Sequence, residues 1–479
     1  MTEAPLKASA PFTLEEVLAA TGGELVRLGG HTRFSALTTD PRLVGAGDLF
    51  VAIRGDTHDG HAFLRDAAVR GAGAVVVEPS HATEPVSCGV IVVRDTLAAL
   101  GELGAHHRRR HRPRVVAITG SNGKTTTKEM LAAVCERALG AAHVLRTIGT
   151  QNNLVGLPLT LLRLSGTEQV AILEVGMNAS GELWRLAQIA EPDVGIITCV
   201  APAHLEGLGS VRGVALAKSE LYRRLRPSAT AIVNADDPLV AGAADAFPGR
   251  KLRFGTGAQP ALSVAARDIV DHGLDGVTFS LIVEGHTAAV RLAVPGRHNV
   301  TNALAAAAAA HALGVEADAV RAGLEAFQPP GMRMEVTQLP TGVTVLNDAY
   351  NANPASMAAA LRTLAASRGR RRVAVLGEMR ELGAESARAH EALGAEAAGA
   401  ALDRLILLGP HADRVRAGAE AAGMAADRIV VATGHEDAGA QLRAYCRAGD
   451  LVLLKGSRGA AMEKVLGHFQ GQRPPESAS

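Results

Sequence analysis

The 479-residue sequence has few aromatic side chains and few cysteines. It contains one tryptophan, three tyrosines and nine phenylalanines, so its cores must be built mainly from alanine, valine, leucine and isoleucine. The four cysteines are widely scattered and form no CxxC pair, which argues against both a zinc site and a disulfide framework. They are Cys88, Cys135, Cys199 and Cys446.

The sequence also has no large excess of positive or negative charge. Lysine and arginine total 49 and aspartate and glutamate total 48, which gives a net charge of +1. A nucleic acid or an anionic membrane surface is therefore not expected as the main partner. The basic run from His106 to Arg114 contains no aromatic residue, and we interpret it as a solvated helix end followed by a linker.

No apolar run reaches the ~18 residues that a membrane-spanning helix requires. The longest candidate, Ala303 to Ala310, is rich in alanine and ends at His311, which favours a packed helix and no stable membrane insertion. The first twelve residues, MTEAPLKASAPF, lack the basic start and apolar run of a secretory signal. These absences predict a soluble cytoplasmic protein.

Short apolar runs alternating with helical stretches predict an α/β architecture. At ~150 residues per domain the length suggests three domains, and the runs after residue 115 are unalternating, as in a buried parallel sheet. The region 254–294 has period-two traits that indicate a small antiparallel addition, and Asn299 is the predicted N-cap of a helix over Val300–Leu313. The predicted strands are Leu49–Ile53, Ala74–Glu78, Val115–Thr119, Val170–Leu173, Val194–Val200, Ala231–Val233, Val343–Leu346, Val373–Leu376, Leu405–Leu408, Ile429–Val431 and Leu451–Leu454.

The segment 118–126, ITGSNGKTT, follows a predicted strand and opens a predicted helix. This is the context of a phosphate-binding loop, in which backbone N–H groups and a helix N-terminus surround phosphate oxygens. Lys124 would supply a full positive charge to the phosphates, and the Thr125 hydroxyl could complete a Mg²⁺ shell. The first glycine position of the usual GxxxxGK[ST] pattern holds Ile118, so the motif is shorter than usual.

Two further side chains lie just past predicted strand ends. Glu174 closes the run AILEV, and His204 follows the next strand in CVAPAHLEG. Ligands bind at the carboxyl edge of such sheets, so both residues are candidates for a metal site beside the phosphate loop. Lys218, by spacing alone, is a surface lysine that pairs with Glu220 or Glu206.

Several segments, in their order along the whole chain, resemble the Mur ligase family, which forms amide bonds during peptidoglycan precursor synthesis. Within that family, DAYNANPASM (348–357) is similar to the segment of members that add a D-alanyl-D-alanine dipeptide. The other segments are GDLFVAIRGDTHDGHAF (47–63), which is similar to the family's uridine-nucleotide-binding domain, GSNGKTT (120–126), QNNLVGLPLT (151–160), LEVGMNASGE (173–182), APAHLEGLGS (201–210), ALAKSE (215–220), PGRHNVTNALAA (295–306), MRMEV (332–336), LGEMRELG (376–383) and KGSR (455–458).

The resemblance implies a fold of three domains. They are a small mixed α/β domain that binds a UDP-sugar peptide (1–112), a central P-loop-type parallel-sheet ATPase domain (113–328) and a C-terminal Rossmann-like α/β domain that binds the incoming dipeptide and closes over ATP (329–479). The substrates implied are UDP-MurNAc-tripeptide and D-alanyl-D-alanine, the cofactors are ATP and Mg²⁺, and a monomer is expected.

The resemblance also implies residue roles. The catalytic set is Lys124, Lys218, His204 and Glu174. ATP would be held by Gly120, Ser121, Asn122, Gly123, Lys124, Thr125, Thr126, Asn299, Asn302, Arg333 and Asp348. Mg²⁺ would be bound by Thr125 and Glu174, and a second Mg²⁺ by His204 and a carbamylated Lys218. The substrates would meet Asp40, Arg42, Tyr350, Asn351 and Asn353.

Two other classes of function remain open at this point. The chain could be a sibling ligase, either another amino-acid-adding Mur enzyme or a folylpolyglutamate synthase. It could instead be a P-loop switch or motor, which would bind nucleotide and protein partners without making an amide bond.

Overall fold

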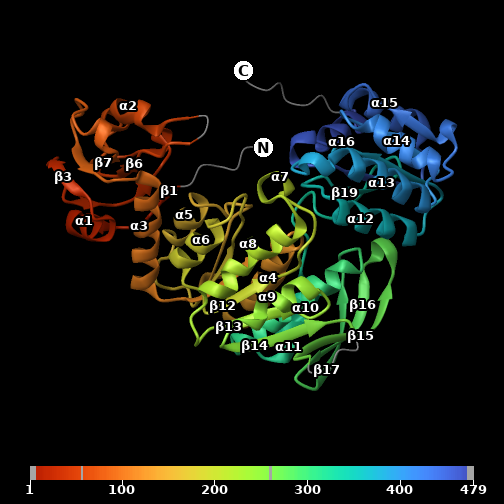
Figure 1. The fold of residues 1–479 in the computed structure, drawn as a ribbon, viewed down its shortest axis with the longest axis horizontal. Coiled ribbons are helices and arrows are strands. Elements are labelled where there is room, and N and C mark those ends of the chain that lie inside the picture. The colour runs from red at the N-terminus through yellow and green to blue at the C-terminus, as the bar shows by residue number, and fades with distance from the viewer. Residues whose placement is uncertain (1–6, 56–57, 258–261, 472–479) are drawn as a thin grey trace.

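A computed structural model describes residues 7–55, 58–257 and 262–471. Within these ranges the chain forms three large sheets, each flanked by helices (Figure 1). The domains that carry the first and third sheets lie on opposite sides of the central one. The expected three-domain α/β architecture is thereby confirmed.

The first domain is a mixed sheet crossed by short helices. Its strands are ordered β1 (Lys7–Ala8), β5 (Leu37–Thr38), β6 (Leu49–Val51), β7 (Ala74–Val77), β8 (Gly89–Val92) and β3 (Glu24–Arg27), and β2 (Phe12–Thr13) pairs with β4 (Arg33–Phe34). The helices are α1 (Leu14–Thr21), α2 (Leu64–Val69) and α3 (Thr96–His111). The last of these runs beside the central domain (Figure 1).

The central sheet is parallel from β10 to β15 and ends in an antiparallel β16 and β17, as the period-two region predicts. Alternate residues of β9 serve opposite faces: Val116 and Ile118 join one core, and Val115 and Ala117 the other. The order is β10 (Val144–Arg146), β11 (Val170–Glu174), β9 (Arg114–Thr119), β12 (Val194–Ile197), β13 (Thr230–Asn234), β14 (Arg250–Gly255), β15 (Val264–Asp271), β16 (Val277–Val283) and β17 (His286–Leu292).

Helices cover both faces of this sheet. One core holds α4 (Lys124–Leu139), α10 (His298–Ala312) and α11 (Ala317–Ala326). The other holds α5 (Gly156–Leu161), α6 (Glu182–Ala190), α8 (Val211–Arg224) and α9 (Pro238–Asp245), and α7 (Leu205–Leu208) precedes α8. The alanines of 303–310 in α10 are fully buried, so the alanine-rich run is a core helix.

The third domain is a parallel sheet with one antiparallel edge strand, β18. Its order is β18 (Glu335–Gln338), β19 (Thr344–Asp348), β23 (Leu451–Lys455), β20 (Arg372–Leu376), β21 (Arg404–Leu407) and β22 (Ile429–Val431). One face packs on α12 (Pro354–Ala366), α13 (Ser386–Gly399) and α14 (Ala412–Ala421), and the other on α15 (His435–Tyr445) and α16 (Glu463–Phe469).

Two local predictions are wrong. Helix α10 begins at His298 and not at Val300, so Asn299 lies in its first turn; the Asn299 side chain donates to the Pro295 carbonyl at 2.7 Å and does not cap the helix. The basic run does end helix α3, but His107 and Arg108 are buried and not solvated. They pack on the central domain, where the His107 ring contacts the Leu164 carbonyl and Arg108 pairs with Glu191.

Among the described residues, no helix is both long enough and apolar enough to span a membrane. The prediction that the chain starts without a secretory signal rests partly on residues 1–6, which lie outside the described residues.

Candidate functional site

The phosphate loop joins β9 to α4 and is held open by its two glycines. Gly120 and Gly123 have φ values of 150° and 81°, which only glycine adopts at little cost. A Cβ on Gly120 would also lie 1.8 Å from the Thr198 hydroxyl. The loop is fastened to the end of β12, because the Ser121 amide donates to the Cys199 carbonyl and the Thr198 hydroxyl to the Asn122 carbonyl.

Lys124 opens α4, and its side chain curls back over the loop. Its amine donates to the Gly120 carbonyl at 2.8 Å, and Lys124 lines the large cavity beside the loop. Burial lowers the pKa of the Lys124 amine, while the carboxylate of Glu174 acts in the opposite direction. An amine in this position is available to anionic oxygens that enter the loop.

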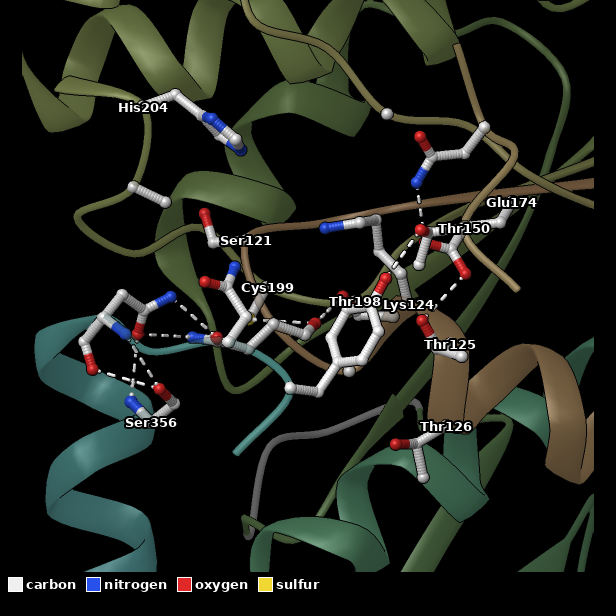
Figure 2. Close-up of a pocket in the computed structure, with 18 of the residues that line it drawn as sticks. Ser121, Lys124, Thr125, Thr126, Thr150, Glu174, Thr198, Cys199, His204 and Ser356 are labelled. Carbon is white, nitrogen blue, oxygen red and sulfur yellow. Dashed lines mark hydrogen bonds between the residues drawn. The ribbon is translucent and has the colours of Figure 1, made fainter. Parts of the chain in front are cut away.

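Thr125 and Glu174 lie next to each other, one from α4 and one from the end of β11. The Thr125 hydroxyl donates to one Glu174 oxygen at 2.9 Å, and the Asn152 amide donates to the other at 2.8 Å. Figure 2 shows both labelled residues on the same side of the cavity. The structure therefore brings together a hydroxyl and a carboxylate, which are oxygen ligands of the kind that Mg²⁺ prefers.

Sequence reasoning missed Lys128, one turn further along α4. This lysine is fully buried and donates to the Thr147 and Gly149 carbonyls at 2.8 and 3.0 Å. Its amine also lies 3.9 Å from Glu174. A lysine four residues after Lys124 in a polar helix start resembles a surface residue, so the sequence offers no signal for this role.

His204 lies on the opposite side of the phosphate loop from Glu174 (Figure 2). Its ring Nδ1 is 2.7 Å from Glu381 of the third domain, and this hydrogen bond lowers the pKa of Glu381. The surface position predicted for Lys218 from spacing is wrong: its side chain is buried in α8 near Lys124, and burial lowers the pKa of its amine to about 7. No hydrogen bond or ion pair joins His204 to Lys218 in the part of the chain that the structure describes.

The two asparagines of α10 lie against the phosphate loop. Asn302 donates to Asn299 at 2.9 Å, and a Cβ on Gly123 would lie 2.2 Å from the Asn302 amide oxygen. Both side chains are buried, and both residues line the cavity.

The third domain supplies the facing wall of the cavity. The Arg333 guanidinium lies 3.9 Å from the centre of the Tyr350 ring, and the Tyr350 hydroxyl is 2.6 Å from the Thr150 hydroxyl of the central domain. Asp348 pairs with Lys455 at 2.5 Å. These side chains, which are distant from the phosphate loop in sequence, are thus brought to it by the packing of the two domains.

Asn351 and Asn353 have different surroundings. Asn351 is exposed, and its side chain accepts only the adjacent Ala352 amide within the described contacts. Asn353 is buried and caps helix α12, and its amide also meets Asn122 of the phosphate loop. Figure 2 shows Ser356, in the first turn of α12, on the side of the cavity where Ser121 lies.

Asp40 and Arg42 are not brought to the cavity. They pair with each other at 2.6 Å on the first domain, and the Arg42 side chain is 75% exposed. The first domain contributes other residues to the cavity wall, namely Ile53, Arg54, Gly55 and Leu97. Ile53, Arg54 and Gly55 lie in the segment 47–63 that resembles the family's UDP-binding domain. Nothing in the sequence distinguishes Leu97, because it faces the cavity only through the placement of the whole domain.

The cavity has a volume of about 1360 Å³ and is lined by all three domains. Polar groups from the phosphate loop, the end of β11 and the third domain converge on it. Such a volume and lining fit a nucleotide together with other substrate groups.

Three family models match successive parts of the chain. The Mur ligase family catalytic domain matches residues 33–108, the Mur ligase middle domain 118–310 and the Mur ligase glutamate ligase domain 332–458.

Curated and solved proteins match over nearly the full length. The UDP-N-acetylmuramoyl-tripeptide–D-alanyl-D-alanine ligase of Escherichia coli K12 is 37% identical over 96% of this chain and 98% of its own. A crystal structure of MurF from Acinetobacter baumannii is 32% identical with a TM-score of 0.88, covering 96% of this chain and 99% of that one. MurF ligase from Thermotoga maritima, solved with ADP, is 26% identical with a TM-score of 0.81, covering 91% and 97%.

Proposed function

Because the chain belongs to the Mur ligase family, we propose that it joins the terminal carboxylate of UDP-MurNAc-tripeptide to the amine of D-alanyl-D-alanine. ATP is converted to ADP and phosphate in this reaction. The observation that carries the proposal is the phosphate loop, with Lys124 at its end, inside a cavity lined by three domains. The full-length likeness to ligases with this activity gives independent support.

The chemistry accounts for the need for ATP. A carboxylate is a poor electrophile, because its leaving group would be oxide. Transfer of the γ-phosphoryl group makes an acyl phosphate, and the dipeptide amine then attacks its carbonyl carbon and displaces phosphate. Negative charge builds on phosphoryl oxygens, and we assign its stabilisation to Lys124 and the loop amides. No Ser–His–Asp nucleophile is required.

The residues around Glu174 fit a Mg²⁺ ion. The Thr125 hydroxyl and the Glu174 carboxylate are 2.9 Å apart, and both face the nucleotide cavity. We assign these two residues to the ion, which when bound would neutralise phosphate charge. Asn152 and Lys128 hold the Glu174 carboxylate in place from the protein side.

A second Mg²⁺ would require a different state of Lys218. An ammonium group repels a cation, whereas a carbamate made from the amine and CO₂ is an anionic oxygen ligand. Carbamylation needs the neutral amine, and the lowered pKa of Lys218, about 7, supports it. We assign His204 and carbamylated Lys218 to this ion.

The remaining assignments follow the family pattern. Asn299, Asn302, Arg333 and Asp348 are proposed to contact ATP. Tyr350, Asn351 and Asn353 are assigned to the dipeptide side, and Asp40 and Arg42 to the UDP-sugar, which then extends from the first domain to the cavity. We propose that the enzyme acts in the cytoplasm, as a monomer.

Phosphate release tests the proposed function directly. We expect phosphate from Mg-ATP and UDP-MurNAc-tripeptide to be released in step with amide product only when D-alanyl-D-alanine is added. Lys124→Ala should lower the rate by at least about 10²-fold, because one preorganised charge-stabilising donor is lost. Near-normal turnover of this variant would remove the phosphate-loop assignment.

Amine competition separates the sibling ligases. D-Alanyl-D-alanine, meso-diaminopimelate and glutamate are offered together, and the product is identified by mass. A folylpolyglutamate synthase or another Mur enzyme would select a different amine. A switch or motor would show nucleotide-dependent partner binding and no phosphate release stimulated by the two substrates.

A further inference from the structure

The phosphate loop and the third domain are joined by a reciprocal pair of side-chain amides. Asn353 donates to the Asn122 amide oxygen at 2.8 Å, and Asn122 donates back to the Asn353 amide oxygen at 3.3 Å. The two residues are 231 positions apart in sequence, and Asn353 is 7% exposed.

The orientation of this pair is fixed by helix α12. The amide oxygen of Asn353 accepts the Ser356 backbone N–H at 3.0 Å, and the Ser356 hydroxyl accepts the Asn353 N–H in return. A backbone N–H can only donate, so the oxygen of Asn353 must face the helix. Its NH₂ group is then left to face Asn122. The same side chain therefore caps α12 and presents a donor to the phosphate loop.

Asn122 is held equally firmly from the central domain. Its carbonyl accepts from the Thr198 hydroxyl at 2.5 Å and from the Cys199 thiol at 3.6 Å. Two residues later, Lys124 reaches back to the carbonyl of Gly120. The contact with Asn353 therefore acts on a loop residue whose backbone the central domain also holds.

Among the described residues, two other polar contacts between side chains join the same domains around the cavity: His204 with Glu381, and Thr150 with Tyr350. Of these three contacts, the asparagine pair alone includes a phosphate-loop residue. We infer that Asn122 and Asn353, beyond the contacts with ATP and the dipeptide assigned to them above, form a positioning pair that couples docking of the third domain to the geometry of the phosphate loop. This inference rests on the proposed function.

The coupling has a chemical purpose. An acyl phosphate that meets water before the amine is hydrolysed to the original carboxylate and free phosphate, and one ATP is consumed without an amide bond. Docking of the third domain both excludes water and brings the dipeptide wall to the cavity. With the pair broken, the loop can still hold ATP through its backbone, but the third domain is docked less of the time.

The matched variants are Asn353→Ser and Asn353→Ala. Serine keeps the cap on α12 but is too short to reach Asn122, whereas alanine loses both contacts. We expect both variants to lower kcat roughly tenfold, about the worth of one net hydrogen bond, and to leave the Kd of ATP within about twofold of the native value. Only the alanine variant should lose thermal stability through the missing cap.

The decisive readout is the number of phosphates released per amide formed. In the native enzyme this ratio is expected to be one, and in Asn353→Ser and Asn122→Ala it should exceed one. The double variant Asn122→Ala/Asn353→Ser should be no worse than either single variant, because the contact is already lost. A native ratio and kcat in Asn353→Ser, or additive losses in the double variant, would overturn the inference. A native enzyme that fails to release phosphate with both substrates would instead refute the proposed function.

Discussion

Lys218 is the residue whose surroundings depart most from its sequence pattern. By spacing it is a surface lysine in a charged helix, yet its side chain is 1% exposed and burial lowers its pKa to about 7. An ordinary lysine, with a pKa of 10.5, is almost wholly protonated at neutral pH. The lowered pKa makes the neutral amine of Lys218, the form that can react with CO₂, far more populated at neutral pH than that of an ordinary lysine.

This pKa gives a pH-dependent prediction. After CO₂ is removed, activity should be lost, and added bicarbonate should restore it. At constant dissolved CO₂ the recovery rate should rise between about pH 6 and pH 8 and then level off, because the amine is by then largely neutral. Lys218→Ala should fold, as judged by its circular dichroism, but should not be rescued. A recovery rate that still climbs above about pH 9 would contradict the lowered pKa.

At this scale, residues within a motif could be predicted and their partners could not. Lys124, Thr125 and Glu174 follow from a glycine loop and a strand end, which are local patterns. Asn353 offers no such signal for its contact with Asn122, because that contact depends on how two domains dock. The buried role of Lys128 depends on carbonyls about 20 residues away in a loop without regular structure.

At the scale of secondary-structure elements, helix α3 attaches the first domain to the central one through a buried histidine. The His107 Nε2 lies 2.8 Å from the Leu164 carbonyl, whereas its Nδ1 is buried without a described partner. Burial lowers the pKa of His107 to about 4, from 6.5. The folded protein therefore holds this ring in the neutral form.

The sign of the resulting pH effect follows from linkage. As pH falls below about 6.5 the unfolded chain takes up a proton at His107 and the folded chain does not, so stability is lost until about pH 4. His107→Gln keeps an N–H donor but cannot titrate. Between pH 7 and pH 4 the free energy of unfolding of the native protein should therefore fall by about 1–3 kcal/mol more than that of this variant. Urea unfolding at both pH values measures this difference. Identical pH profiles for the two proteins would show that the ring is not held neutral.

Glu220 links α8 to the start of α6. Its carboxylate accepts from the Ser180 hydroxyl and from the Gly181 and Trp184 amides, at 2.8–3.0 Å. Glu220→Ala leaves these donors without their acceptor, and we expect the free energy of unfolding to fall by about 2–3 kcal/mol. Trp184 is the only tryptophan, so its fluorescence should shift in this variant. Glu220→Gln keeps one acceptor oxygen, so its free energy of unfolding should lie between those of the native protein and Glu220→Ala. Equal stability of the native protein and both variants would exclude the capping role.

On the scale of the whole molecule, the cavity exists only because three domains meet. Tyr350 contributes in two ways: its ring lies under Arg333, and its hydroxyl meets Thr150 across the domain boundary. Tyr350→Phe keeps the first contact and removes the second. We expect Tyr350→Phe to have a larger radius of gyration than the native protein in solution scattering without nucleotide, and a kcat about threefold to tenfold lower than the native value.

Tyr350→Ala serves as the comparison, because it removes both contacts and should lower activity further. If Tyr350→Phe has the native radius of gyration and the native kcat, the hydroxyl contact does not hold the domains together.

The number and class of the domains could be predicted from hydrophobic runs, since buried parallel strands are short and apolar. Strands β10 and β18 were not predicted, because they are short and partly exposed and have weak patterns. The packing between domains lies beyond any local pattern, so the sequence does not predict that residues of the first domain line the same cavity as the phosphate loop.

The alanines of α10 have a consequence for how this site can vary. Their methyl groups have no rotamers to freeze on folding and none to change afterwards, so this part of the core, which packs on α4, cannot repack around a bulkier neighbour. Substitutions at these positions of α10 are confined to residues about as small as alanine. Variation near the phosphate loop must therefore come from residues that line the cavity, while the alanine core behind α4 stays as it is.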